Sequence, residues 1–106
     1  MPWVLLLLAG LLEVVWAYTM KLSDGFSRPV PTAITFLAMF ASFGLLAVAM
    51  KSLPLGTAYS TWTGIGAIGA FVVGVVALGE AASPLRVLAA VMIVGGLVLM
   101  KLSSPA

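Results

Sequence analysis

The stretch 3–20, WVLLLLAGLLEVVWAYTM, is an apolar run of helix length with one charged residue, Glu13, near its middle. At about 1.5 Å per residue, a helix over this stretch is roughly 27 Å long, close to the hydrocarbon thickness of about 30 Å of a bilayer. The stretch therefore predicts a membrane-spanning helix that carries a carboxyl group at mid-membrane depth.

Three more apolar runs of helix length follow, at 32–50, 56–78 and 85–101. The segments between them contain the charges, the prolines and turn signals such as Asp24-Gly25. These connections are short, so successive helices must run antiparallel. We predict an all-α membrane protein with four transmembrane helices in a single domain over residues 1–106.

The composition excludes several classes of function. Hydrophobic residues make up 63% of the chain and charged residues 8%, against about 25% charged residues in ordinary soluble domains. The chain has no His and no Cys, which excludes the usual zinc sites, a cysteine nucleophile and a Ser-His-Asp triad. The five basic residues are dispersed, so we expect no nucleic-acid binding. We also expect no metal, no cofactor and no enzymatic activity.

The basic residues are nearly balanced between the two ends of the predicted helices. Lys51 and Lys101 lie on the side of the chain ends, and Lys21, Arg28 and Arg86 lie on the other. Membrane orientation follows the Lys/Arg bias of short loops, which is almost absent here. The chain is therefore a candidate for insertion in both orientations, giving an antiparallel pair; the alternative is that one dominant charge fixes a single topology.

An oligomer is also expected because four helices can hardly enclose a hydrated pathway. Many transporters use inverted repeats, and an antiparallel homodimer supplies that symmetry with one sequence. Ala89 and Gly96 share a face of the last run and are candidate dimer contacts through small side chains. The alternative is that they serve packing within the chain.

Glu13 is the first candidate functional residue. A carboxylate at this depth costs about 3 kcal/mol or more to insert and commonly marks an ion or proton path. The low dielectric disfavours the charged form, so Glu13 is a candidate proton carrier. The alternative is a permanently protonated acid that hydrogen-bonds a neighbouring helix. Trp16 lies on the same face and suggests a small binding site, with helix packing as the alternative.

The third run supplies aromatic and glycine candidates. Tyr59 and Trp62 are one turn apart, suited to hold a cation on their ring faces, and Tyr59 is a candidate hydrogen-bond donor to Glu13. Gly64 and Gly66 lower helix stability at mid-membrane and are candidate hinge residues. Close packing through small residues is the alternative for both glycines.

The remaining candidates lie on the second and fourth runs. Ser42 is placed to hydrogen-bond either an acid from another helix or the carbonyl of Ala38, four residues back. Met39 and Phe43 are candidate residues of a lateral portal. Lys101 extends its ammonium group toward the membrane surface, or takes part in closing the site.

With these residues identified, the sequence resembles the small multidrug resistance family of bacterial four-helix transporters over nearly the whole chain. The matching motifs are GLLEVVWA at 10–17, KLSDGFSR at 21–28, LPLGTAYSTWTGIG at 53–66 and GE at 79–80. Trp16 beside the acid, KSLP at 51–54, WTGIGA at 62–67 and the closing Lys101 are similar to the guanidinium exporter subtype rather than to the polyaromatic-drug subtype.

The resemblance implies an antiparallel, dual-topology homodimer in the bacterial inner membrane. It implies that two copies of Glu13 bind either protons or substrate, surrounded by Trp16, Ser42, Tyr59 and Trp62. The function implied is proton-coupled antiport of guanidinium, or a small guanidinyl cation, by alternating access. The partners implied are the cation, protons, the lipid bilayer and a second copy of the chain.

Two alternatives remain open from the sequence. An exporter of small quaternary ammonium or other toxic cations would rely on ring faces, because its substrates lack N–H donors. A non-transporting membrane scaffold would use Glu13 only as a contact between helices.

Overall fold

The computed structural model describes residues 2–103, which form four helices. These are α1 (Pro2–Leu22), α2 (Pro29–Ala49), α3 (Leu55–Leu78) and α4 (Pro84–Ser103). Each helix is long and apolar enough to cross a membrane, and no strand occurs within residues 2–103. The predicted all-α fold with four membrane spans is confirmed; residue 1 and residues 104–106 of the expected domain lie outside the described range.

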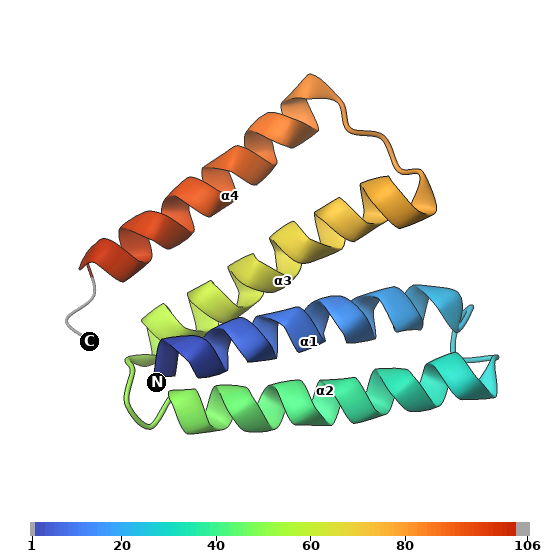
Figure 1. Ribbon diagram of the computed structural model, residues 1–106, viewed down its shortest axis with the longest axis horizontal. Helices are drawn as coiled ribbons and strands as arrows, with labels where there is room; N and C mark the ends of the chain where they lie inside the picture. The colour runs from blue at the N-terminus through green and yellow to red at the C-terminus, as the bar shows by residue number, and fades with distance from the viewer. Residues whose placement is uncertain (1, 104–106) are drawn as a thin grey trace.

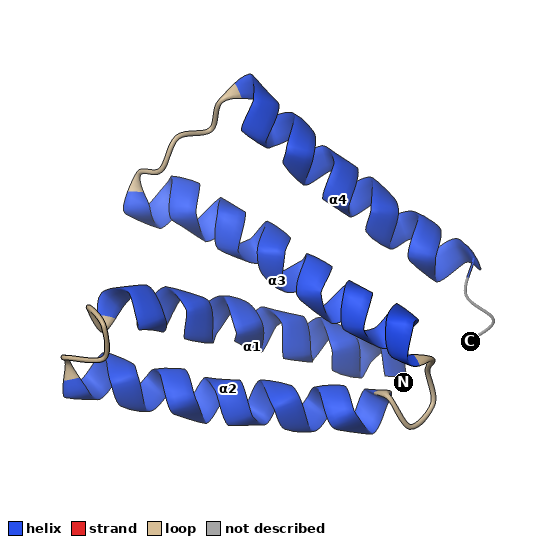
Figure 2. Ribbon diagram, turned by 180° about the vertical axis from the view of Figure 1, so that it is seen from behind, coloured by secondary structure: helices blue, strands red, loops and turns tan. Residues whose placement is uncertain are grey.

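The four helices lie side by side in a flat layer of about 43 × 35 × 16 Å (Figure 1). The antiparallel helices α1 and α2 form a hairpin, α3 packs on α1, and α4 packs mainly on α3. The beginning of α1 and the end of α4 lie at the same end of the layer (Figure 2). A layer of this thickness is about one helix deep, because a helix with its side chains measures about 10–12 Å across.

Proline and glycine set several of the helix ends. Pro29 and Pro84 begin α2 and α4, where the missing N–H of proline would have no partner within the helix. Gly79 ends α3 with a φ of 70°, a left-handed conformation that glycine adopts at no steric cost. In the α1–α2 turn, the Ser23 hydroxyl accepts a hydrogen bond from the Phe26 N–H at 3.0 Å.

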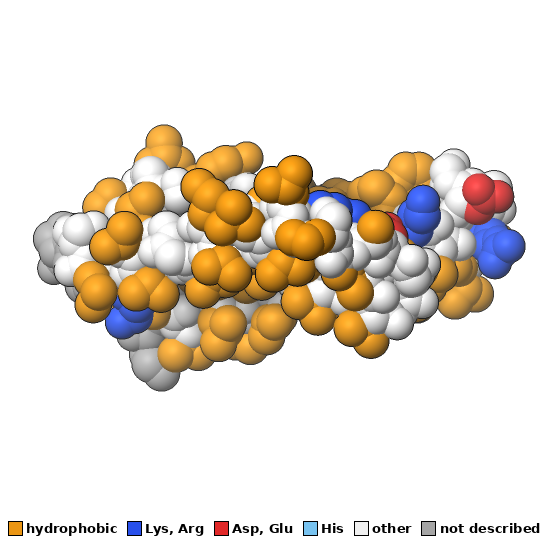
Figure 3. All heavy atoms as spheres, turned by 90° about the horizontal axis from the view of Figure 1, so that it is seen from above, with side chains coloured by type: hydrophobic (Ala, Val, Ile, Leu, Met, Phe, Trp, Pro, Cys, Tyr) orange, Lys and Arg blue, Asp and Glu red, His pale blue; other side chains and the backbone are white. Residues whose placement is uncertain are grey.

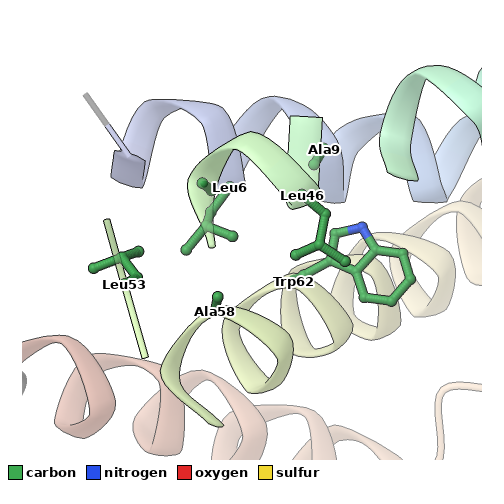
Figure 4. Close-up of a cluster of buried hydrophobic side chains, with 7 residues drawn as sticks. Leu6, Ala9, Leu46, Leu53, Ala58 and Trp62 are labelled. Atoms are coloured by element: carbon green, nitrogen blue, oxygen red, sulfur yellow. The ribbon is translucent and has the colours of Figure 1, made fainter. Parts of the chain in front are cut away.

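The buried apolar core is small and lies where α1 begins, α2 ends and α3 begins (Figure 4). It contains side chains from these three helices and from the α2–α3 connection: Leu6, Ala9, Leu46, Ala49, Leu53, Ala58 and Trp62. Helix α4 has no buried residue. The side chains that face outward are mostly apolar (Figure 3), as a surface in contact with lipid requires.

Glycines bring α1 and α3 into close contact along a seam. A Cβ atom built on Gly10 would collide with Ile65, and one built on Gly69 would collide with Val14. Because each helix offers a glycine to a branched side chain of the other, the two backbones approach closely. Small residues have the same effect at many helix contacts in membranes.

A pair of threonines joins α1 to α2 near the other end of the hairpin. The hydroxyl groups of Thr19 and Thr35 lie 2.7 Å apart, and both residues are buried. Thr35 also hydrogen-bonds the Pro31 carbonyl at 2.8 Å, within its own helix. The pair therefore links two helices at a position where few other polar groups are available.

Replacing Thr35 by Val should destabilise the protein by about 1 kcal/mol, because it removes this hydrogen bond between helices. Thr32→Val is the matched control, since the Thr32 hydroxyl bonds only the Arg28 carbonyl beside its own helix. Unfolding in bicelles measures both variants. Equal losses in the two would contradict a stabilising role for the Thr19–Thr35 pair.

Candidate ion-binding site

Glu13 projects from α1 toward α3, where its side chain lies against the backbone at Gly66. A Cβ atom built on Gly66 would collide with the Glu13 carboxyl group. Only a residue without a side chain leaves room for the acid at this point. The α1–α3 seam thus holds the carboxyl group at the middle of the layer.

Two polar atoms of this region have no hydrogen-bond partner within residues 2–103. They are the buried Glu13 Oε1 and the buried Trp16 Nε1, which lie on one face of α1. A buried polar group left unpaired costs about 1–3 kcal/mol, so such groups usually indicate a missing water, ion or ligand. The polar groups of this site are therefore not satisfied within residues 2–103.

Ser42 connects all three helices through hydrogen bonds. The Trp62 Nε1–H of α3 donates to the Ser42 Oγ at 2.9 Å, and the Ser42 hydroxyl donates to the Ala9 carbonyl of α1 at 2.7 Å. Both partners expected for Ser42, an acid and the Ala38 carbonyl, are therefore wrong. The side chain of Ala9 is small and fully buried, so α2 can approach α1 closely. The Ala9 carbonyl then accepts the Ser42 hydrogen bond in place of the Ala38 carbonyl.

The role of Ala9 could not be predicted from the sequence. Its contribution is a backbone oxygen, and a small apolar side chain in an apolar run gives no signal of that role. The Ser42–Trp62 bond fixes the orientation of the indole, since its only N–H is used.

Four aromatic rings from three helices form a continuous row next to the acid. The centroids of Trp16 and Phe43 lie 6.5 Å apart, those of Phe43 and Trp62 5.9 Å, and those of Trp62 and Tyr59 5.5 Å. Edge and tilted contacts of this kind leave ring faces available to a cation. Trp62 is 6% exposed and Tyr59 52% exposed, so the row contains both a buried ring and a ring that reaches the surface.

The contact of Phe43 with both indoles, Trp16 and Trp62, was not predicted from the sequence. Phe43 lies between the two indoles and remains 43% exposed, whereas Met39, one turn earlier on α2, is partly buried. The portal role of both residues stays a prediction. The structure adds that Phe43 belongs to the wall of the site.

The expected hydrogen bond from Tyr59 to Glu13 is absent within residues 2–103. The reason is the position of Tyr59 along α3. It precedes Gly66, which contacts the acid, by seven residues, or about 10 Å of helix. Trp62 is one turn from Gly66 and therefore lies closer to Glu13 along the helix.

Gly64 and Gly66 are both buried and both are in close contact with a neighbouring helix. A Cβ atom on Gly64 would come within 2.6 Å of Leu97 on α4. Helix α3 is continuous from Leu55 to Leu78, so close packing is the observed role of both glycines. Their hinge role stays a prediction.

The predicted dimer contacts on α4 are exposed. Ala89 lines a groove between α3 and α4, and a Cβ atom on Gly96 would meet no atom within 4 Å. Packing within the chain therefore makes no use of the space beside Gly96. Contact with a second copy stays a prediction.

Lys101 lies far from Glu13, at the end of the layer where α1 begins. Its Nζ is 5.2 Å from the centroid of the Trp3 ring. Trp3 and Glu13 are ten residues apart, or about 15 Å along the helix. A direct role of Lys101 at the acid is therefore not favoured by this arrangement.

Four membrane-spanning helices with an incompletely paired acid at their middle define a multi-pass membrane protein with a polar site inside the bilayer. The model of the Small Multidrug Resistance protein family matches residues 1–94, and the chain belongs to this family. It is a multi-pass protein of the bacterial inner membrane.

Individual relatives cover almost the entire chain. The chain is 56% identical over 104 residues to proteins named guanidinium exporter from Escherichia coli (strain K12) and Salmonella typhimurium (strain LT2), covering 98% of this chain and 99% of each relative. It is also 56% identical to a guanidinium exporter of Yersinia pestis, with 98% of this chain and 100% of the relative covered.

Replacing Gly66 by Ala should destabilise the protein by about 1–3 kcal/mol, because the new methyl group would displace the Glu13 carboxyl group. Gly44→Ala on α2 is the control, since a Cβ atom there would meet no atom within 4 Å. That control should be neutral or slightly stabilising. Thermal unfolding in detergent compares the two; equal melting temperatures would contradict the tight Glu13–Gly66 contact.

Proposed function

We propose that this protein exports guanidinium in exchange for protons, with the Glu13 residues of two antiparallel copies as the shared ion site. The observation that carries the proposal is the buried, unpaired Glu13 oxygen beside a row of aromatic rings. The names of the relatives at 56% identity support the same substrate.

The chemistry of guanidinium fits such a site. The ion is planar, stays protonated at neutral pH, and has paired N–H donors that match the two oxygens of a carboxylate. Its flat faces stack on aromatic rings. Glu13 supplies the acceptor, and the row formed by Trp16, Phe43, Trp62 and Tyr59 supplies the faces.

A second copy completes the site in this proposal. A layer about one helix deep leaves the pathway without an opposite wall, and a second layer would provide it. If the second copy is inverted, the pair has the symmetry that lets one central site open to either side of the membrane. The exposed Gly96 and the groove at Ala89 make α4 the candidate contact.

Coupling follows from charge at low dielectric. Two ionised carboxylates in one apolar site repel each other and are poorly solvated, so the empty, doubly charged state is too costly to change sides. Either protons or the cation must neutralise the acids before the conformational change. Each transport cycle therefore exchanges one kind of positive charge for the other.

Glu13→Gln should abolish guanidinium uptake driven by a pH gradient in proteoliposomes, because the amide neither binds protons nor pairs with the cation. In the unmodified protein, guanidinium affinity should fall as pH is lowered, since protons compete for the same oxygens. Cation binding that is independent of Glu13 and of pH would instead favour the scaffold alternative.

Export of small quaternary ammonium ions is the second candidate, because the rings of the aromatic row, of which Tyr59 is exposed, could hold such ions without any N–H donor on the ion. Tyr59→Phe keeps the ring and removes the hydroxyl. In this proposal the Tyr59 hydroxyl oxygen accepts a hydrogen bond from a guanidinium N–H. Its loss should weaken guanidinium transport by about three- to tenfold and leave tetramethylammonium transport unchanged.

Tyr18→Phe is the control for that substitution, because Tyr18 lies on α1 beside a different cavity. Competition between the two cations in a transport assay measures the effect. A stronger loss for tetramethylammonium than for guanidinium would favour the quaternary ammonium alternative.

A further inference from the structure

A cavity of about 460 Å³ opens between α1, α3 and α4, away from the row of aromatic rings. It lies at the end of the layer where α1 begins and α4 ends. We call it the α1–α4 groove. Its walls are almost entirely apolar and are formed mainly by Val4, Leu7, Ile65, Leu97 and Val98.

One rim of the α1–α4 groove carries a positive charge. Lys101 and Trp3 both line it, and the Lys101 ammonium group lies 5.2 Å from the centre of the Trp3 ring. Lys101 forms no ion pair within residues 2–103, where the pair recorded is Arg86 with Glu80. The groove therefore combines an apolar interior with a cation that has no acidic partner among the described residues.

The position of the groove in the membrane follows from the helices. Trp3 is near the start of α1 and Lys101 near the end of α4, and Trp and Lys at the ends of spans are typical of the membrane interface. From this rim the groove extends to Leu7 and to Ile65, which packs against Gly10 one turn before Glu13. It runs from the headgroup level toward the middle of the bilayer.

We propose that the α1–α4 groove binds one anionic phospholipid, with the phosphate at Lys101 and an acyl chain between α1 and α4. The apolar walls match a hydrocarbon chain. A phosphate would supply a negative charge that residues 2–103 lack at this rim. One basic residue near a membrane surface favours anionic lipid by about fivefold.

A second copy of the chain is the rival occupant, because α4 is exposed along its length. A helix with its side chains is about 10–12 Å across, so a helix of a second copy would lie over this groove rather than enter it. A single acyl chain is narrow enough to fill it. The unpaired ammonium group at the rim also favours a lipid over an apolar helix face.

The test uses the full-length protein in bilayer discs and needs no transport measurement, so it is independent of the proposed function. Phosphatidylglycerol or phosphatidylcholine with brominated acyl chains is added, and the quenching that depends on Trp3 is obtained by subtracting the signal of Trp3→Phe. Phosphatidylglycerol should bind about fivefold more strongly than phosphatidylcholine. Lys101→Gln should remove this preference.

Lys51→Gln is the matched control. Lys51 is exposed, lies at the same end of the layer and does not line the groove, so its loss should leave the preference intact. Val98→Phe is a second variant that narrows the groove from a half-exposed position and should lower quenching by both lipids. Equal quenching by the two lipids, or an equal effect of Lys51→Gln, would overturn the proposal.

The rival occupant has its own measurement. The chain contains no Cys, so a single Val98→Cys substitution reports directly on neighbours at the groove. Oxidation in the bilayer discs should give no disulfide between copies. Efficient cross-linking at this position would place a second copy over the groove and overturn the lipid site.

Discussion

The contact between the Glu13 carboxyl group and the Gly66 backbone is the constraint on which the rest of the arrangement depends. An acid in the middle of a membrane helix must be placed where it costs least, and the glycine seam between α1 and α3 provides that place. The seam also sets the distance between the two helices. The positions of Trp62 on α3 and of Ala9 on α1, and therefore of Ser42 between them, follow from that distance.

The hydrogen bonds of the site are arranged so that the indole of Trp62 is satisfied and the acid is not. Trp62 donates to Ser42, and Ser42 donates to Ala9, so the chain of donors ends on a carbonyl group. Within residues 2–103, the Glu13 oxygen and the Trp16 nitrogen on α1 are buried and unpaired, as is the Thr61 hydroxyl on α3. The orientation of Trp62 is therefore fixed by hydrogen bonds within the described residues, whereas the polar atoms of Glu13 and Trp16 are left without a partner there.

The fold could be predicted from sequence because the bilayer permits few alternatives. Four apolar runs of about the right length, separated by charged and proline-containing segments, can only be spanning helices. Glu13, Trp16 and Trp62 could be identified as candidates because polar and aromatic residues are conspicuous in such a background. The partner of Ser42 could not, because it is a backbone carbonyl and depends on how closely α1 and α2 approach. The predicted hydrogen bond from Tyr59 to Glu13 was wrong for a similar reason. The face of α3 on which Tyr59 lies could be predicted, but not the depth in the membrane at which α3 meets Glu13 of α1.

The attachment of α4 has a mechanical consequence. This helix packs mainly on α3, where Leu97 meets Gly64, and its contact with α1 is the Lys101 ammonium group over the Trp3 ring. The other three helices are joined by buried hydrogen bonds and a common core. A change in the curvature of α3 near Gly64 would therefore change the position of α4. The hairpin of α1 and α2 shares the buried core with the start of α3, whereas α4 contributes no residue to it, so α4 is the helix whose position depends least on the buried core.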